Sequence, residues 1–213
     1  MSDYQRARSP EQKAERMTAI MDAAQALFDE LPYHEINMGL IAKELGWSRS
    51  NLYKYASTQE EVFLALHTRA SAAYVSDLVD RLSSAPMENA EFAKIWASTT
   101  GEHIDFLRYQ DILIAIIESN ASLDRLVEFK RSFAQMMPPL IDVISRQLDC
   151  DEDVAQKFYF TAIYQAPGLY NHFNCAERTA EAMRIVGMKL FEGNFEESYA
   201  AFIAMCLQHF SNR

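Results

Sequence analysis

The sequence is poor in glycine and proline, the two residues that most often interrupt helices. It has six of each among 213 residues, about half of the roughly 12% that average usage gives. An all-β fold needs many turns that contain these residues, so their scarcity favours long helices. Apolar residues recur at helical spacing along the chain, and no stretch shows the period-two alternation of a strand. The sequence therefore predicts an all-α fold.

Long apolar runs are also absent. The longest unbroken aliphatic stretch is 112–117, far short of the ~20 residues that span a bilayer. The three cysteines, Cys150, Cys175 and Cys206, are widely spaced and form no CxxC pair, which disfavours a disulfide framework or a zinc site. We therefore expect a cytoplasmic protein with no membrane partner and with free thiols; a redox sensor is the alternative.

Motifs that carry catalysis are missing as well. The glycines form neither a phosphate-binding loop nor GxGxxG, and there is no GxSxG or HExxH. A helical di-iron site needs Glu-x-x-His pairs, but no glutamate stands three residues before any of the five histidines. Cys206 and His209 share a helical spacing, but two ligands alone do not make a metal site. We therefore expect no enzyme activity, no cofactor and no metal.

Negative charge prevails, but it is unevenly distributed. The formal net charge is −10, which argues against a nonspecific nucleic-acid coat. Residues 1–56 hold seven Lys and Arg against eight Asp and Glu, whereas residues 57–213 hold thirteen against twenty-two. Only the N-terminal quarter is near enough to neutral to lie against a polyanion.

Residues 37–55 have the pattern of two helices joined by a tight turn. Asn37 and Ser48 are typical helix N-caps, and Gly46 is typical of a helix C-terminus because it adopts left-handed backbone angles. So short a connection between two helices is typical of a helix-turn-helix, whose second helix enters the major groove of DNA. An αα-corner with a solvated second helix has the same spacing, so spacing alone leaves both interpretations open.

The polar side chains of this segment suit DNA by their chemistry. Hydroxyl, amide and basic groups bind phosphates, and arginine and asparagine also read base edges. The candidate DNA-binding residues are Asn37, Ser48, Arg49, Ser50, Asn51, Tyr53, Lys54 and Tyr55.

Four short segments carry a resemblance to a known family. They are AQALF at 24–28, IAKELGWS at 41–48, RSNLYKY at 49–55 and EEV at 60–62. With these segments, residues 10–63 resemble the DNA-binding domain of the TetR (tetracycline-repressor) family of bacterial regulators. The resemblance implies a flexible arm at 1–8, a three-helix helix-turn-helix DNA-binding domain at 9–57, and a larger helical ligand-binding and dimerisation domain at 58–213.

The same resemblance implies a function. The protein would be a ligand-responsive transcriptional regulator, a repressor, that binds a palindromic operator in double-stranded DNA as a homodimer. A small apolar or amphipathic effector would release it. A helical adaptor or regulator that no longer binds DNA or a small ligand is the alternative.

The sequence departs from the family pattern at four places in or near the helix-turn-helix. Asn37 stands where a threonine is frequent, and Tyr55-Ala56 stands where His-Phe is common. Pro32-Tyr33 stands where a glycine–aromatic pair is usual, and Gln59 stands where a lysine is usual. The change at residue 59 removes an expected phosphate charge. For Arg6 and Arg8 we expect a disordered tail, and an arm on the DNA is the alternative. Phosphate contacts should therefore depend more on Asn37, Tyr53, Lys54 and Tyr55.

Residues 58–213 contain many apolar and aromatic side chains that could form the implied ligand pocket and dimer interface. Aromatic and methionine side chains line apolar pockets because they offer large, adaptable surfaces, although a plain core uses the same residues. The pocket candidates are Trp96, His103, Phe106, Tyr109, Phe133, Met136, Met137, Tyr159 and Tyr164. The interface candidates are Ala162, Ile163, Ala166, Tyr170, Phe195, Tyr199, Phe202, Ile203 and Phe210. Pro138-Pro139 and Pro167-Gly168 are expected to break or kink their helices.

Overall fold

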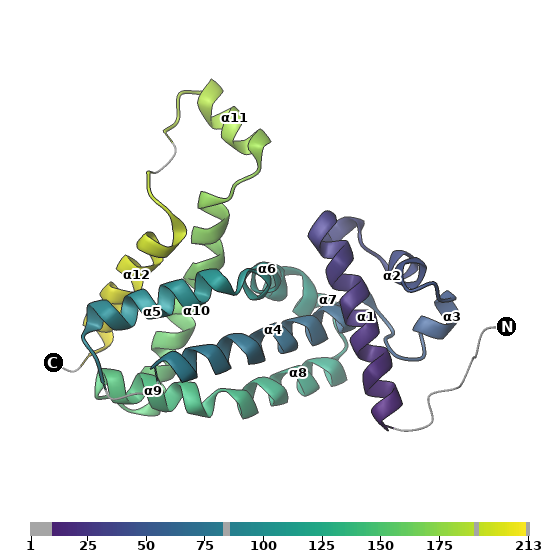
Figure 1. Cartoon of the computed structure of the whole chain (residues 1–213), viewed down its shortest axis with the longest axis horizontal. Coiled ribbons are helices and arrows are strands. Elements are labelled where there is room, and N and C mark those ends of the chain that lie inside the picture. Colours follow the sequence, from purple (N-terminus) through teal and green to yellow (C-terminus); the bar gives the residue numbers. More distant parts are fainter. Residues whose placement is uncertain (1–9, 83–85, 190–191, 212–213) are drawn as a thin grey trace. The chain divides into compact units, whose positions relative to one another are not determined.

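The structure is a computed structural model that describes residues 10–82, 86–189 and 192–211. Every regular element in these ranges is helical, which confirms the all-α prediction (Figure 1). The elements are α1 (Pro10–Glu30), η1 (Tyr33–Glu35), α2 (Met38–Glu44), α3 (Arg49–Leu52), α4 (Gln59–Leu82), α5 (Asn89–Glu102), α6 (Ile104–Ile112), η2 (Leu113–Ile117), α7 (Glu118–Asn120), α8 (Leu123–Met136), α9 (Pro138–Leu148), α10 (Glu152–Phe173), α11 (Glu177–Ile185) and α12 (Phe195–Phe210). Of these, η1 is a 3-10 turn and η2 a π-helical turn.

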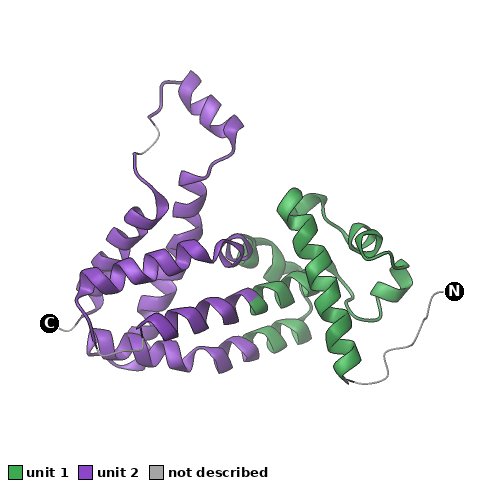
Figure 2. Ribbon diagram, in the orientation of Figure 1, with its two compact units in different colours: residues 1–69, 112–130 green, residues 70–111, 131–213 purple. Residues whose placement is uncertain are grey.

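The helices form two compact units (Figure 2). Unit 1 comprises residues 1–69 and 112–130, and unit 2 comprises residues 70–111 and 131–213. Helices α4 and α8 each contribute to both units. This division differs from the expected domain boundary at residues 57–58, because unit 1 also takes in the start of α4 and the segment around α7.

In unit 1, polar caps and one glycine delimit the short helices of the helix-turn-helix, as predicted. The Asn37 side chain accepts hydrogen bonds from two N–H groups in the first turn of α2, at 3.0 and 3.1 Å. After α2 ends, Gly46 takes a φ of +66°, a left-handed angle that costs other residues free energy. Ser48 Oγ then accepts a hydrogen bond from the N–H of Asn51 at 3.3 Å, which starts α3.

The start of α4 carries a capping box in a shifted form. The N–H of Glu61 donates to the Thr58 hydroxyl at 3.3 Å, whereas the Glu61 carboxylate accepts a hydrogen bond from the N–H of Ser57 at 2.8 Å. The same carboxylate lies 3.6 Å from Nε of Arg125 in α8. Glu61 therefore stabilises the chain between α3 and α4 and links it to α8.

Unit 2 has an aromatic core. Helix α12 packs against α5 and α10, and α10 packs against α9. Trp96 of α5, Phe158 of α10 and Tyr199 of α12 are fully buried, and the rings of Trp96 and Phe158 meet edge-on at 5.4 Å. Burial of each large apolar side chain contributes about 1.5–3 kcal/mol. The described residues of this core are apolar or aromatic, and their burial holds these helices together.

The two proline sites behave differently. The predicted break at Pro138-Pro139 is confirmed, because α8 ends at Met136 and α9 begins at Pro138. Proline suits the first turn of a helix, where its missing N–H leaves no helical hydrogen bond unmade. At Pro167, by contrast, the helix does not break: α10 runs from Glu152 to Phe173 with Pro167 inside it. Pro167 is buried, and the packing around it outweighs the lost hydrogen bond.

Candidate functional site

Helices α2 and α3 form the predicted helix-turn-helix in unit 1. The turn between them is closed by a hydrogen bond from the N–H of Trp47 to the carbonyl of Ala42, at 2.8 Å. Ile41 in α2 and Leu52 in α3 are fully buried, so each helix is anchored by one apolar face. The opposite face of α3 is left to polar residues, as a recognition helix requires.

The predicted DNA-binding residues lie on α3, directly beside it, or at the start of α2. The exposed ones are Asn37, Ser48, Arg49, Ser50, Tyr53 and Lys54, and the half-buried ones are Asn51 and Tyr55. Tyr53 is 51% exposed, although large rings are usually well covered. Asn37 and Ser48 also serve as helix caps. The structure thus brings all eight to one small region, while their contact with DNA stays a prediction.

The Arg49 side chain lies across the first turn of α2. A methyl group added at Gly39 would overlap the Arg49 guanidinium group, so the glycine makes room for this contact. Sequence reasoning missed Gly39, because the contact depends on how the two helices cross. A glycine in the first turn of a short helix, where it lowers helix propensity, is the one signal that pointed to it.

An aromatic pair supports both ends of α3. Trp47, in the turn before α3, lies 5.9 Å from the ring of Tyr55, which follows α3. The Arg16 guanidinium of α1 lies 5.1 Å from the centre of the Trp47 ring. A cation–π contact at a partly exposed site contributes about 0.5–1 kcal/mol. Arg16 and Trp47 therefore help to position the recognition helix, a role that sequence reasoning also missed.

Two of the departures from the family pattern, Tyr33 and Gln59, contact each other. The Gln59 side-chain amide donates a hydrogen bond to the Tyr33 carbonyl at 3.1 Å, and the Tyr33 hydroxyl donates to the Glu60 carboxylate at 3.2 Å. Partial burial, and then the Glu60 charge, raise the pKa of the Tyr33 hydroxyl well above its ordinary value, so it stays a donor. The start of α4 therefore fixes the chain that follows α1 and presents no cation at residue 59.

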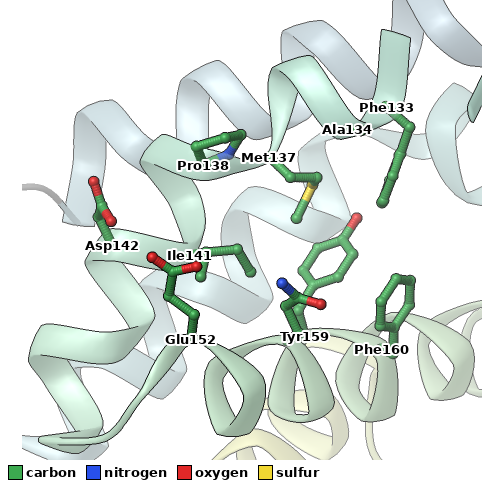
Figure 3. A pocket seen from close by; sticks show the side chains of 10 residues that line it. Phe133, Ala134, Met137, Pro138, Ile141, Asp142, Glu152, Tyr159 and Phe160 are labelled. Carbon is green, nitrogen blue, oxygen red and sulfur yellow. The ribbon is translucent and has the colours of Figure 1, made fainter. Parts of the chain in front are cut away.

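Unit 2 contains a groove where α8 ends, α9 begins and the first half of α10 packs against them (Figure 3). Its volume is about 300 Å³, at the lower end of the range for ligand sites. Met137, Ile141 and Tyr159 are buried, and Figure 3 shows their side chains pointing into the space between the helices. The lining residues are Phe133, Ala134, Met137, Pro138, Ile141, Asp142, Glu152, Gln156, Tyr159 and Phe160.

The predicted pocket residues divide between this groove and the rest of unit 2. Those that line the groove are Phe133, Met137 and Tyr159. Those that pack elsewhere are Trp96, Phe106 and Tyr109, which are buried, and Met136, which is half-buried. Tyr164 is 55% exposed and stacks on Phe160, with ring centres 5.7 Å apart. The groove also has lining residues that sequence reasoning missed, among them Asp142 and Glu152.

His103, the remaining pocket candidate, belongs to an ionic cluster that joins α4 to α5. Its Nε2 lies 3.0 Å from Oδ2 of Asp77. Arg81 donates to Asp77 at 2.7 Å and to both carboxylate oxygens of Glu102 at 2.9 and 2.6 Å. Against the effect of burial, which raises it, hydrogen bonds from His103 and Arg81 lower the pKa of the Asp77 carboxyl. The hydrogen bonds from Arg81 likewise lower the pKa of Glu102.

The predicted interface stripes of α10 and α12 are largely covered by the chain itself. The buried members are Ala162, Ile163, Ala166, Phe195, Tyr199 and Ile203, and the half-buried ones are Tyr170, Phe202 and Phe210. The Tyr199 hydroxyl donates to the Ala162 carbonyl at 2.9 Å, so the two stripes meet each other. The buried members therefore pack in the subunit's own core, while a place for the half-buried Tyr170, Phe202 and Phe210 in an interface stays a prediction.

Other sequence expectations concern the cysteines, metals and membranes. Burial raises the pKa of the Cys150 and Cys206 thiols, which keeps both protonated at neutral pH. Among the described residues, no group of three or more His, Cys, Asp or Glu side chains is placed to hold a metal ion. Within the same ranges, no helix has an apolar stretch that would reach across a bilayer. Arg6 and Arg8 lie outside the described residues.

Comparison with solved structures supports the fold. A transcriptional regulator of the TetR/AcrR family from Thermobifida fusca is 17% identical over 93% of this chain and 100% of its own, with a TM-score of 0.54. A TetR-family regulator from Streptomyces coelicolor is 18% identical over 92% and 99%, with a TM-score of 0.52. The fatty acid degradation regulator FadR from Bacillus halodurans is 14% identical over 96% of each chain, with a TM-score of 0.50. At these identities the similarity shows the fold alone.

Comparison with protein families goes further. The family model described as bacterial regulatory proteins, tetR family, matches residues 20–66. The model described as tetracyclin repressor-like, C-terminal domain, matches residues 68–210, which is most of the chain. A search of curated proteins found no match. The two family matches cover the helix-turn-helix and the helical remainder in the expected order. The chain therefore belongs to the TetR family and is a DNA-binding transcriptional regulator.

Proposed function

We propose that the protein is a homodimeric repressor that binds a palindromic operator and is released by a small-molecule effector. The observation that carries the proposal is the exposure of Arg49 in α3 and of Tyr53 and Lys54 directly after it, on a short helix that is anchored by the buried Leu52. Residues 57–213 are strongly acidic and would repel DNA, so we expect the contact to be confined to the helix-turn-helix. The regulator would act in the cytoplasm, where its operator is.

The residues of the helix-turn-helix have different roles in the proposal. Lys54 binds a phosphate, which positions the protein without reading sequence. Arg49 and Asn51 reach base edges, since arginine pairs with guanine and asparagine with adenine through two hydrogen bonds each. Tyr53 adds a phosphate contact through its hydroxyl. Arg49 lies against α2 at Gly39, and we expect it to swing from there into the groove when DNA binds.

We place the dimer interface on the faces of α10 and α12 that the subunit leaves open. Met205 of α12 is 63% exposed and Tyr164 of α10 is 55% exposed, and Ala201 is also exposed one turn before Met205. A two-fold axis beside these helices buries the same surface from each subunit. It also fixes the distance between the two recognition helices, as a palindromic operator requires.

Helix α8 supports a ligand response. It carries Phe133, which lines the groove, and Arg125, which lies 3.6 Å from the Glu61 carboxylate at the start of α4. A ligand that shifts α8 would therefore act on the residue that stabilises the chain after the recognition helix. The effector releases the operator only if it binds more tightly to the conformation that does not bind DNA. Bound DNA then lowers the affinity for the effector by the same factor.

A mobility-shift titration with the DNA upstream of the protein's own coding region tests the proposal. We expect the wild-type protein to form a discrete complex, and the double variant Arg49→Ala/Lys54→Ala to lose it. The control is Lys94→Ala, which removes an exposed lysine of α5 and should change nothing. If the wild-type protein forms no complex with this or any selected DNA, the adaptor hypothesis is favoured instead.

A further inference from the structure

The groove between α8, α9 and α10 has aromatic walls. Phe133 of α8 and Phe160 of α10 stack with ring centres 6.1 Å apart and an angle of 29°. The Tyr159 ring meets Phe160 edge-on at 5.4 Å, and Tyr164 extends the row by stacking on Phe160. Rings present negative faces to whatever lies against them, so they attract cations as well as apolar groups.

Among the described residues that line the groove, the only charged side chains are two carboxylates. Asp142 of α9 and Glu152 of α10 lie at one end of it, and Phe133 and Phe160 lie at the other (Figure 3). Within the described residues, neither carboxylate has an ion pair or a side-chain hydrogen bond. Both ends of the groove therefore favour positive charge.

We propose that this groove binds an organic cation with an apolar, ring-bearing body. The body fills the space over Met137, Ile141 and Tyr159 and packs against the rings of Phe133 and Phe160, and the cationic group lies at the end of the groove that holds Asp142 and Glu152. A ligand with a carboxylate would be repelled at the same end. The surplus of acidic residues in 57–213 adds a long-range attraction for cations. That such a ligand acts as the effector rests on the proposed function; that it binds does not.

The probes that test the proposal are matched in shape and differ in charge. Benzyltrimethylammonium is the cation, neopentylbenzene is its neutral carbon isostere, and 3-phenylpropanoate is an anion of similar size. In calorimetric titrations of the full-length protein, we expect the cation to bind about tenfold more tightly than either of the others. Added salt should lower the affinity for the cation and leave the affinity for the isostere unchanged, because salt screens exposed charges.

Variants of the two carboxylates then test whether they hold the cationic group of the ligand. The double variant Asp142→Asn/Glu152→Gln should lose about tenfold in affinity for the cation, since each exposed carboxylate contributes only a few-fold, and should keep its affinity for the isostere. The control Asp153→Asn removes the neighbouring exposed carboxylate of α10, which does not line the groove, and should have little effect.

Three outcomes overturn the proposal. In the first, the wild-type protein binds the isostere or the anion as tightly as the cation, with no dependence on salt. In the second, Asp153→Asn lowers the affinity for the cation as much as the double variant does. In the third, no probe binds. The titrations contain no DNA, so they decide this proposal whatever the protein does on an operator. Failure to bind any DNA would contradict the proposed function and leave the groove result unchanged.

Discussion

Asn37, the N-cap of α2, can be changed in two ways that test its contribution to stability and its contribution to DNA binding separately. Asn37 accepts two hydrogen bonds, at 3.0 and 3.1 Å, from the first turn of a seven-residue helix. Replacing it by alanine leaves both N–H groups without that partner and costs about 1 kcal/mol, as for N-caps generally. In a chain of this length we expect Asn37→Ala to lower Tm by about 2–4 °C, measured by circular dichroism.

Asn37→Asp should behave differently. Its carboxylate accepts the same two hydrogen bonds and gains from the helix dipole, so Tm stays at or above the wild-type value. Operator affinity should nevertheless fall several-fold, because we expect residue 37 to face a phosphate and the new charge repels it. Asn194 offers a matched control: it caps α12 through the N–H of Glu197 at 2.9 Å, far from α3 in sequence. Asn194→Asp should keep both stability and affinity.

Two results would refute this reasoning. If Asn37→Ala unfolds at the wild-type temperature, the cap contributes no net stability. If Asn37→Asp binds the operator as tightly as the wild-type protein does, the start of α2 does not face a phosphate.

Further predictions concern DNA contacts, acid stability and assembly. Lys54→Ala should lower the affinities for operator and nonspecific DNA about equally and reduce the slope of log K against log salt by about one. A loss of affinity for the operator alone would show that Lys54 reads bases. Arg49→Ala should cost about 1–3 kcal/mol of discrimination at one base pair, measured by competition with single-base operator variants; unchanged discrimination at every position would exclude direct reading. The lowered pKa values of Asp77 and Glu102 stabilise the fold above the ordinary carboxyl pKa of about 4, and this contribution is lost as pH falls through the lowered values. Asp77→Asn should therefore lower Tm at pH 7 and much less at pH 2, and an equal loss at both would contradict the ionic account. Met205→Glu should give a folded monomer in sedimentation, because an interface would bury the unpaired charge; a wild-type dimer would move the interface elsewhere.

Local chemistry was enough to predict the two short helices and the turn between them, and the family resemblance identified them as a helix-turn-helix. The caps at Asn37 and Ser48 and the left-handed Gly46 are confirmed, because each depends only on neighbours within four residues. The contact of Arg49 with Gly39 was not predicted, since it depends on how two helices cross. Sequence patterns report the first kind of interaction and carry almost no signal for the second.

The larger unit was harder for a related reason. An apolar stripe such as the one through Tyr199 and Ile203 has the same spacing whether the chain's own helices or a partner cover it, and here the chain covers it. Aromatic residues likewise look alike in sequence whether they line a groove, as Phe133 does, or fill a core, as Trp96 does. Asp142 and Glu152 were overlooked because an exposed carboxylate is ordinary until a groove is seen beside it.

Selection of binding sites from a random pool of DNA, with the purified wild-type protein, tests the central claim most directly. A homodimer that places two copies of α3 in the major groove should enrich a palindrome whose half-sites lie about one helical turn, ~34 Å, or a multiple of it apart. The same selection with Arg49→Ala/Lys54→Ala should enrich nothing. Enrichment of a sequence without two-fold symmetry, or no enrichment by the wild-type protein, would contradict the account.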